Sequence, residues 1–288
     1  MDLAVVVLVQ ILYAIASLAL VSIGLAIIFG MMGVINFAHG EFLMMGGYAF
    51  ILSAGAGVNL WVAMLVVAPL TVGIFGVVVE RLIIRHLYGR IIETVLATWG
   101  LSLFLIGLSA TVLGYHQKGV APPLGIVDIG AYQEGGYTFF VIGMTALLLI
   151  AVYLGLKYTR FGLIMRGTMQ NANMAAALGV SIDRVYAVTF GIGAALSGLA
   201  GAILAPIAGV LPDIGVTYVV KAFITVIGGG AVALAGTGAA ATLFGAVSQI
   251  VTFISRPVVG EVALLVVAII LLRMLPYGIT GRYFRRGL

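Results

Sequence analysis

The sequence predicts an all-α protein, a polytopic transmembrane helical bundle with about eight or nine spans. The chain of 288 residues is 63% hydrophobic and 8% charged, and its mean hydropathy of +1.27 is far above that of soluble globular domains. Its apolar runs approach the roughly 20 residues that a helix needs to cross a hydrocarbon core of about 30 Å. These runs lack the alternation of barrel strands, and unpaired backbone cannot face lipid, so we expect helices. We expect a single transmembrane domain over residues 1–288.

Nine apolar runs are the candidates for the spans. They lie near residues 4–30, 36–54, 60–80, 92–113, 137–156, 187–205, 217–235, 238–254 and 259–275. No positively charged segment and no clear cleavage site accompany the first run, so we expect it to be a mature span. A re-entrant glycine-rich segment would change the number of crossings.

Basic residues concentrate in three segments between or after the spans. They are Arg81, Arg85 and Arg90; Lys157, Arg160, Arg166 and Arg184; and Arg273, Arg282, Arg285 and Arg286. Because cytoplasmic loops carry an excess of Lys and Arg, we place all three segments inside and segments 114–136 and 206–213 outside. This arrangement predicts an outer N-terminus and a cytoplasmic C-terminus. It also accounts for the net charge of +5 without a nucleic-acid partner.

Several kinds of chemistry have no candidate residues in this chain. There is no cysteine, and the three histidines, His39, His86 and His116, lack the spacing of a metal site. No Gly-x-x-x-x-Gly-Lys-Ser/Thr motif is present, so we expect no nucleotide site in this chain. Ser22 or Ser53 with His39 forms no recognisable nucleophile motif, which makes an intramembrane enzyme a poor alternative.

Glycine is abundant within the spans, and one run shows a regular spacing. Gly193, Ser197 and Gly201 lie four residues apart in "FGIGAALSGLAGAIL". In membranes, small residues at this spacing let helix backbones approach closely. We therefore expect this helix to have a tightly packed neighbour.

Two apolar segments share a pattern of an ionisable residue followed by a glycine pair. His39 lies seven residues before Gly46-Gly47, and Lys221 lies seven before Gly228-Gly229. Glycine-interrupted segments in the two halves of a carrier indicate a midplane site formed by broken helices. The alternative is that the glycines only reflect composition and that Lys221 extends to a nearby surface.

The segment "VINFAHGEF" places Asn36, His39 and Glu41 at the start of a predicted helix. Residues two apart do not face each other on a helix, so His39 and Glu41 do not form an acid–base pair. Two interpretations remain. Asn36 caps the helix and Glu41 lies near its positive end, or the three residues line a path through the membrane.

The segment 157–186 is the longest inner loop, and we expect a short helix within it. Its run "NMAAALGV" is rich in alanine, and Gly179 is placed to end the helix. Such a helix would lie along the membrane surface or dock a partner.

Three blocks of the sequence resemble the permease subunits of bacterial ABC importers for branched-chain amino acids, a family that includes urea and short-chain amide permeases. The blocks are "GVINFAHGEFLMMGGYAF", "LGVSIDRVYAVTFGIGAALSGLAGAILAP" and "KAFITVIGGG". The resemblance covers nearly the whole chain. It implies a permease domain in which broken helices move as gates. From the glycine pairs and the polar segment, the residues that we expect beside the translocation pathway are Asn36, His39, Glu41, Gly46, Gly47, Lys221, Gly228 and Gly229.

The resemblance also implies that the loop 157–186 couples the permease to an ATPase. The family pattern is Glu-Ala-Ala, three residues and Gly, and here Asn173, Ala175, Ala176 and Gly179 occupy the corresponding segment. Asn173 replaces the usual acidic residue, so no salt bridge from this position is assumed. Met174 replaces the first alanine of the pattern.

The remaining implications concern partners and substrate. The resemblance implies a second permease subunit, two cytoplasmic ATPases that bind ATP and Mg²⁺, an extracytoplasmic solute-binding protein and a place in the bacterial inner membrane. The run "PDIGVTYVV" favours a urea or amide substrate, and "KAF" favours an amino acid. A stand-alone channel or carrier that uses His39, Glu41 or Glu93 for proton coupling is the alternative from another class.

Overall fold

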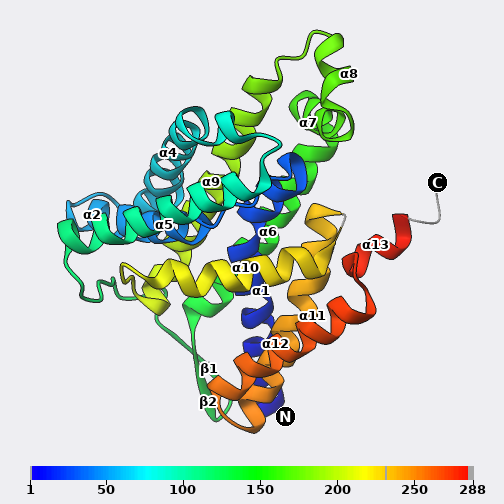
Figure 1. The fold of residues 1–288 in the computed structure, drawn as a ribbon. Coiled ribbons are helices and arrows are strands. Elements are labelled where there is room, and N and C mark those ends of the chain that lie inside the picture. The colour runs from blue at the N-terminus through cyan, green and yellow to red at the C-terminus, as the bar shows by residue number, and fades with distance from the viewer. Residues whose placement is uncertain (1, 231, 285–288) are drawn as a thin grey trace. The chain divides into compact units, whose positions relative to one another are not determined.

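The computed structural model describes residues 2–230 and 232–284, and most of these residues are helical (Figure 1). The helices are α1 (Asp2–Met32), α2 (His39–Gly55), α3 (Leu60–Val62), η1 (Ala63–Val67), α4 (Ala68–Leu82), η2 (Ile84–Leu87), α5 (Ile91–Leu113), α6 (Gly136–Tyr158), α7 (Arg160–Gln170), α8 (Ala172–Ala177), α9 (Ile182–Ala208), α10 (Ile214–Gly229), α11 (Ala233–Ile254), α12 (Pro257–Met274) and α13 (Gly278–Phe284). Seven described helices are long and apolar enough to cross a membrane, and α10 is a shorter apolar helix. The predicted polytopic α-bundle is confirmed.

The described strands form one hairpin in the segment 114–136. Strand β1 (Ile126–Ile129) pairs antiparallel with β2 (Tyr132–Gly135), with Ile126 opposite Gly135. Gly130 supplies the positive φ of +61° that the connecting turn requires. The sequence analysis expected only a loop here.

Contacts divide the chain into two compact units, each built from segments far apart in sequence. Unit 1 contains the residues up to Ser22, 121–149 and the residues from Lys221 onward, and unit 2 contains 23–120 and 150–220. The boundaries fall inside α1, α6 and α10. The single domain expected from the sequence stays a prediction.

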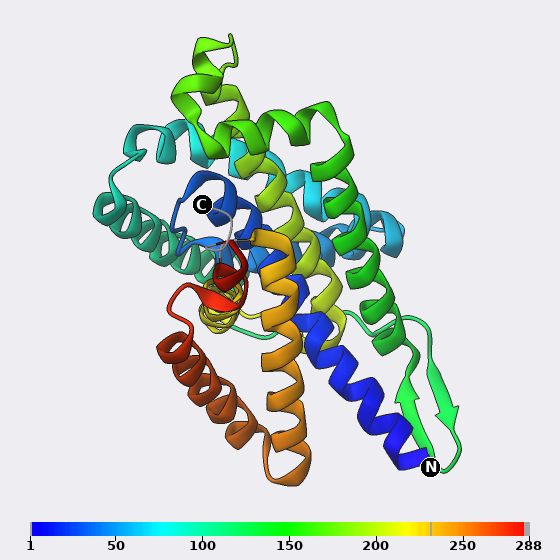
Figure 2. The same cartoon turned by 90° about the vertical axis from the view of Figure 1, so that its right-hand side faces the viewer.

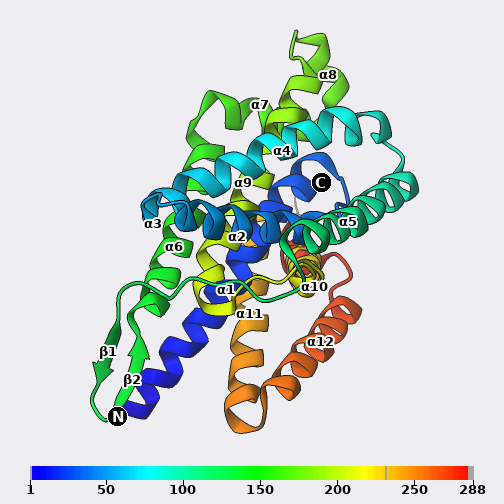
Figure 3. The ribbon, with the colours of Figure 1, turned by 90° about the vertical axis from the view of Figure 1, so that its left-hand side faces the viewer.

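Unit 2 is organised around α9, which packs against α2 and α4 (Figure 3). The Phe42 ring of α2 meets Phe75 and Phe190 edge to face, each with centroids 6.0 Å apart. The α9 backbone lies almost in contact with its neighbours. A Cβ added at Gly201 would lie 1.9 Å from the Leu43 carbonyl oxygen. The close packing predicted for this stripe of small residues is confirmed.

Unit 1 has its own core between α11, α12 and the part of α1 up to Ser22. Figure 2 shows α11 and α12 as a hairpin. The buried side chains at the centre of this core are Leu18, Ala19, Ala240, Ala241, Phe244, Leu264, Ala268 and Leu271. Gly228 of α10 faces the Phe244 ring, which a Cβ at Gly228 would approach to 2.9 Å.

The structure contains one of the two predicted glycine interruptions. Helix α10 ends at Gly229, Gly230 has φ +86°, and α11 begins at Ala233. The run predicted as 217–235 therefore ends several residues early. The prediction at Gly46-Gly47 is wrong, because α2 is continuous from His39 to Gly55. Gly46 packs against Gly198, so the missing side chain serves close helix contact instead of a break.

Candidate functional site

The first turn of α2 carries a buried polar cluster. Asn36, His39 and Glu41 are each 0% exposed. The Asn36 side-chain oxygen accepts a hydrogen bond from the Ala38 amide at 3.0 Å. Asn36 therefore supports the turn before the helix, but the cap position belongs to Ala38, which corrects the predicted N-cap. Glu41 lies in the first turn, as predicted.

His39 connects this cluster to the centre of α9. Its Nδ1 atom lies 3.2 Å from the Ser197 hydroxyl, 158 residues away in sequence. The hydroxyl also lies 2.9 Å from the Gly193 carbonyl oxygen, to which it donates its one proton. Since that proton is used, the hydroxyl accepts from His39 Nδ1–H, so the Nδ1 atom carries a proton.

Other polar atoms of the cluster have no hydrogen-bond partner among the described residues. They are Asn36 Nδ2 and both carboxyl oxygens of Glu41, which the Ser102 side chain of α5 approaches. An unpaired buried donor or acceptor costs about 1–3 kcal/mol, and a buried charge costs more. These atoms could therefore bind a polar solute that enters the bundle.

The predicted glycines differ in their surroundings. A Cβ at Gly46 would lie 2.0 Å from the Gly198 carbonyl oxygen, and one at Gly47 would lie 2.6 Å from Val210. At the end of α10, a Cβ at Gly229 would lie 2.4 Å from the Gly236 backbone. Gly46 and Gly229 need glycine because the added atom would meet backbone, whereas at Gly47 it would meet a side-chain methyl group. The role of these positions beside a pathway stays a prediction.

Lys221 forms an ion pair that the sequence analysis missed. Its ammonium lies 2.6 Å from Glu261 Oε1 on α12, and the two side chains are 29% and 58% exposed. Thr225 donates to the Lys221 carbonyl oxygen within α10 and does not contact the ammonium. The sequence did contain a signal for this partner, because Glu261 is the one acidic residue in the apolar run 259–275.

The predicted helix in the loop 157–186 is present as α8, although it begins one residue before Asn173. The Asn171 side chain caps it by accepting from the Met174 amide at 2.9 Å. At the other end Gly179 has φ +85°, and the Val180 amide donates to the Ala175 carbonyl at 3.0 Å. The role of Gly179 in ending the helix is confirmed.

The surface of α8 is apolar although it belongs to a polar loop. Met174 is 59% exposed and Leu178 is 78% exposed. Asn173, Ala176 and Gly179 are also exposed, whereas Ala175 is buried. Ala175 therefore anchors the helix, and the exposed side chains form the surface on which a partner could dock.

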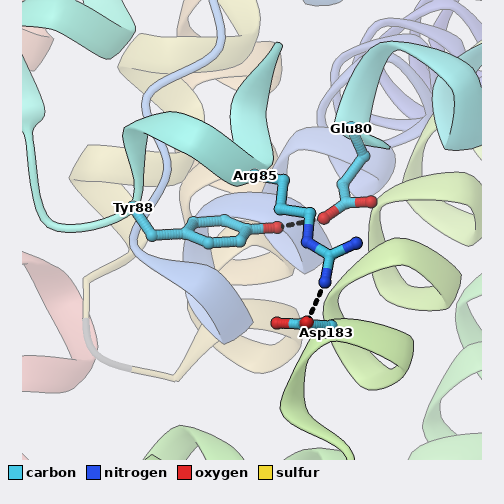
Figure 4. Close-up of polar contacts among 4 residues, drawn as sticks. All are labelled: Glu80, Arg85, Tyr88 and Asp183. Carbon is cyan, nitrogen blue, oxygen red and sulfur yellow. Dashed lines mark hydrogen bonds and ion pairs between the residues drawn. The ribbon is translucent and has the colours of Figure 1, made fainter. Parts of the chain in front are cut away.

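A second polar cluster joins the start of α9 to the end of α4 (Figure 4). Arg85 of η2 forms an ion pair with Asp183, in the first turn of α9. Tyr88 donates a hydrogen bond of 2.5 Å to the buried Glu80. Burial and the neighbouring Glu80 carboxylate raise the pKa of the Tyr88 phenol above its usual range, so it remains a donor. Asp183 lies shortly after α8 in the loop 157–186. The cluster therefore links this loop to the end of α4.

Contacts between loops show which loops lie on the same side of the membrane. The Arg85–Asp183 pair joins two segments that the charge pattern placed inside. In the segments placed outside, Lys118 and Val210 form a backbone bridge and Tyr115 donates to Asp213 at 2.6 Å. Arg285 and Arg286 lie outside the described residues.

The helices long and apolar enough to cross a membrane make this chain a multi-pass membrane protein, with a buried polar cluster in α2 and an exposed helix, α8, in its longest loop. The model of the family described as "Branched-chain amino acid transport system / permease component" matches residues 7–275, and the chain belongs to this family. It is therefore a non-catalytic permease subunit of an ABC transport system.

Curated relatives match over most of the chain. The high-affinity branched-chain amino acid transport system permease protein LivH of Salmonella typhimurium is 29% identical, over 93% of this chain and 92% of its own length. The corresponding protein BraD of Pseudomonas aeruginosa is 30% identical with the same coverage. A probable branched-chain amino acid transport permease protein LivH of Methanocaldococcus jannaschii is 26% identical, over 92% of this chain and 88% of its own. No solved structure matches significantly.

Proposed function

We propose that this chain forms half of the translocation pathway of an importer for branched-chain aliphatic amino acids. The observation that carries the proposal is the capped, exposed helix α8 in a permease-family chain without a nucleotide-binding motif. Such a chain needs ATP hydrolysis by another subunit, and α8 offers a surface for it. The names of the relatives support the choice of solute.

In this proposal the ATPase docks on Asn173, Met174, Ala176, Leu178 and Gly179. Apolar contacts through Met174 and Leu178 take the place of a salt bridge, because position 173 is uncharged. Movement of α8 reaches α9 directly and reaches α4 through Arg85 and Asp183. Helix α9 carries Ser197, so the displacement extends to His39.

The pathway in this proposal follows the polar cluster of α2 and the end of α10. Asn36, His39 and Glu41 offer polar groups within an apolar bundle, which lowers the cost of moving a zwitterion through it. Gly46 and Gly47 allow α2 to lie against α9, and Gly228 and Gly229 end α10 beside α11. These glycines let the helices pack closely.

The complete importer would contain a second permease subunit, two cytoplasmic ATPases with ATP and Mg²⁺, and an extracytoplasmic solute-binding protein. The concentration of basic residues in three segments supports a cytoplasmic position for α8 and an outer position for the N-terminus. The β1–β2 hairpin and the bridge between Lys118 and Val210 then lie on the outer face, where the binding protein docks. The inner membrane of a bacterium is the site of such importers.

The experiment is purification of the tagged chain from its native membrane, followed by uptake measurements in proteoliposomes. We expect an ATPase and a solute-binding protein to co-purify and leucine uptake to require ATP. Urea and acetamide serve as competing solutes. Uptake of these amides without leucine uptake would replace the proposed solute, and leucine uptake without nucleotide would support a stand-alone carrier.

A further inference from the structure

Helices α10 and α12 each carry one charged residue within an otherwise apolar stretch, and these two residues meet. Lys221 is the one charged residue of α10, and Glu261 is the one acidic residue of α12. Their charged groups lie 2.6 Å apart. At a rise of 1.5 Å per residue, Lys221 lies about 10 Å from the start of α10 and Glu261 about 6 Å from the start of α12. Both charges are therefore inside the helices and not at their ends.

The pair is only partly covered by this chain, since Glu261 is 58% exposed and Lys221 is 29% exposed. Charged groups within apolar helices are costly against lipid and generally face a water-filled cavity or another polar surface. Beneath the pair, Ile224 packs on the apolar core that contains Leu264. The charges therefore lie at the edge of a packed core, on a face that needs a polar environment.

The surface beside Glu261 is apolar. Val258 and Leu265 lie three residues before and four residues after it, on the same face of α12, and are 74% and 41% exposed. A neutral ion pair next to exposed aliphatic side chains matches the chemistry of an aliphatic α-amino acid. Such a molecule carries an ammonium, a carboxylate and an apolar side chain.

We propose that Lys221 and Glu261 form a transient binding site for the zwitterionic head group of an aliphatic amino acid, which separates the pair as it passes. The substrate carboxylate replaces Glu261 at Lys221, and the substrate ammonium replaces Lys221 at Glu261. The single contact between Lys221 and Glu261 is replaced by two contacts with the substrate, and the net charge does not change. No unpaired charge is left to hold the solute in place. The inference rests on the proposed function and adds Glu261 to the pathway.

The first test uses the absence of cysteine from the chain. Val258→Cys and Leu265→Cys keep the ion pair intact and place a thiol beside it. Val266→Cys is the matched control, because Val266 is 47% exposed but points about 140° away from Glu261 around α12. In a complex with its other cysteines removed, we expect a membrane-impermeant thiol reagent to label the first two positions, in vesicles of one orientation or the other. Leucine should slow that labelling several-fold, and the control should stay unlabelled.

The second test measures ATP-driven leucine uptake by the complete complex. We expect Lys221→Met and Glu261→Gln each to lower uptake by at least about tenfold. The exchanged pair, Lys221→Glu with Glu261→Lys, should restore part of the uptake, because the two charges remain opposite. Assembly of each complex is checked by size-exclusion chromatography.

The outcomes separate this inference from the proposed function. A wild-type complex that moves urea or acetamide but no leucine overturns the proposed solute. A wild-type complex active on leucine, with both single variants equally active or with no labelling at positions 258 and 265, overturns only the ion-pair site. If a single variant fails to assemble, the labelling experiment decides, because the variants it uses retain both charges.

Discussion

Replacement of Gly201 by alanine should destabilise the protein strongly, because helices α2 and α9 touch there through their backbones. The new Cβ would lie 1.9 Å from the Leu43 carbonyl oxygen and 2.6 Å from the Leu43 carbonyl carbon. Neither atom belongs to a flexible side chain. Relief of the clash requires the two backbones to separate by about 1 Å, and overpacking of this kind costs about 1–3 kcal/mol.

The matched control is Gly107→Ala in α5. Gly107 is also a helical glycine in a membrane span, but no atom lies within 4 Å of its added Cβ. There the gain in helix propensity, up to about 1 kcal/mol, should leave stability equal or slightly higher. The assay is thermal unfolding of the purified permease in detergent or nanodiscs. Equal midpoints for Gly201→Ala and Gly107→Ala would refute the close contact between α2 and α9.

Three further predictions follow from the other sites. Gly179→Pro should abolish ATP-driven uptake with normal membrane insertion, because proline fixes φ near −65° where Gly179 has +85° and removes the amide that donates to Ala176; normal uptake would remove α8 as the coupling element. His39→Ala should change the KM or kcat of uptake if the polar cluster lines the path, and unchanged kinetics would leave only a structural role. Tyr88→Phe should lower the free energy of unfolding by about 1–3 kcal/mol, since it removes the hydrogen bond to buried Glu80; in the Tyr88→Phe protein, an unfolding midpoint equal to that of the wild type would show that this bond adds nothing.

Features that depend on local chemistry were predictable from the sequence. Seven of the nine predicted apolar runs coincide with described helices long and apolar enough to cross a membrane, because a membrane imposes a length and a polarity on each span. The runs 36–54 and 217–235 correspond to the shorter helices α2 and α10. The end of α8 at Gly179 followed from the freedom of glycine at positive φ. The charge pattern put the segment of Arg81, Arg85 and Arg90 on the same side as the loop 157–186, and the Arg85–Asp183 ion pair joins these two segments.

Features that depend on contact between distant segments were not predictable. Glycine is a weak helix former in water, so Gly46-Gly47 suggested a break, whereas packing against Gly198 keeps α2 continuous. The partners Ser197 for His39 and Glu261 for Lys221 come from other helices, and no spacing along one helix indicates them.

The sequence by itself therefore determined that this protein is a multi-pass helical membrane protein with a short capped helix in its longest polar loop. Only the tertiary structure decided which polar residues meet and which glycines are packing positions. The physical reason is that hydropathy, capping and turn formation act within a few residues. Helix packing and ion pairing depend on atoms that folding brings together from segments far apart in the chain.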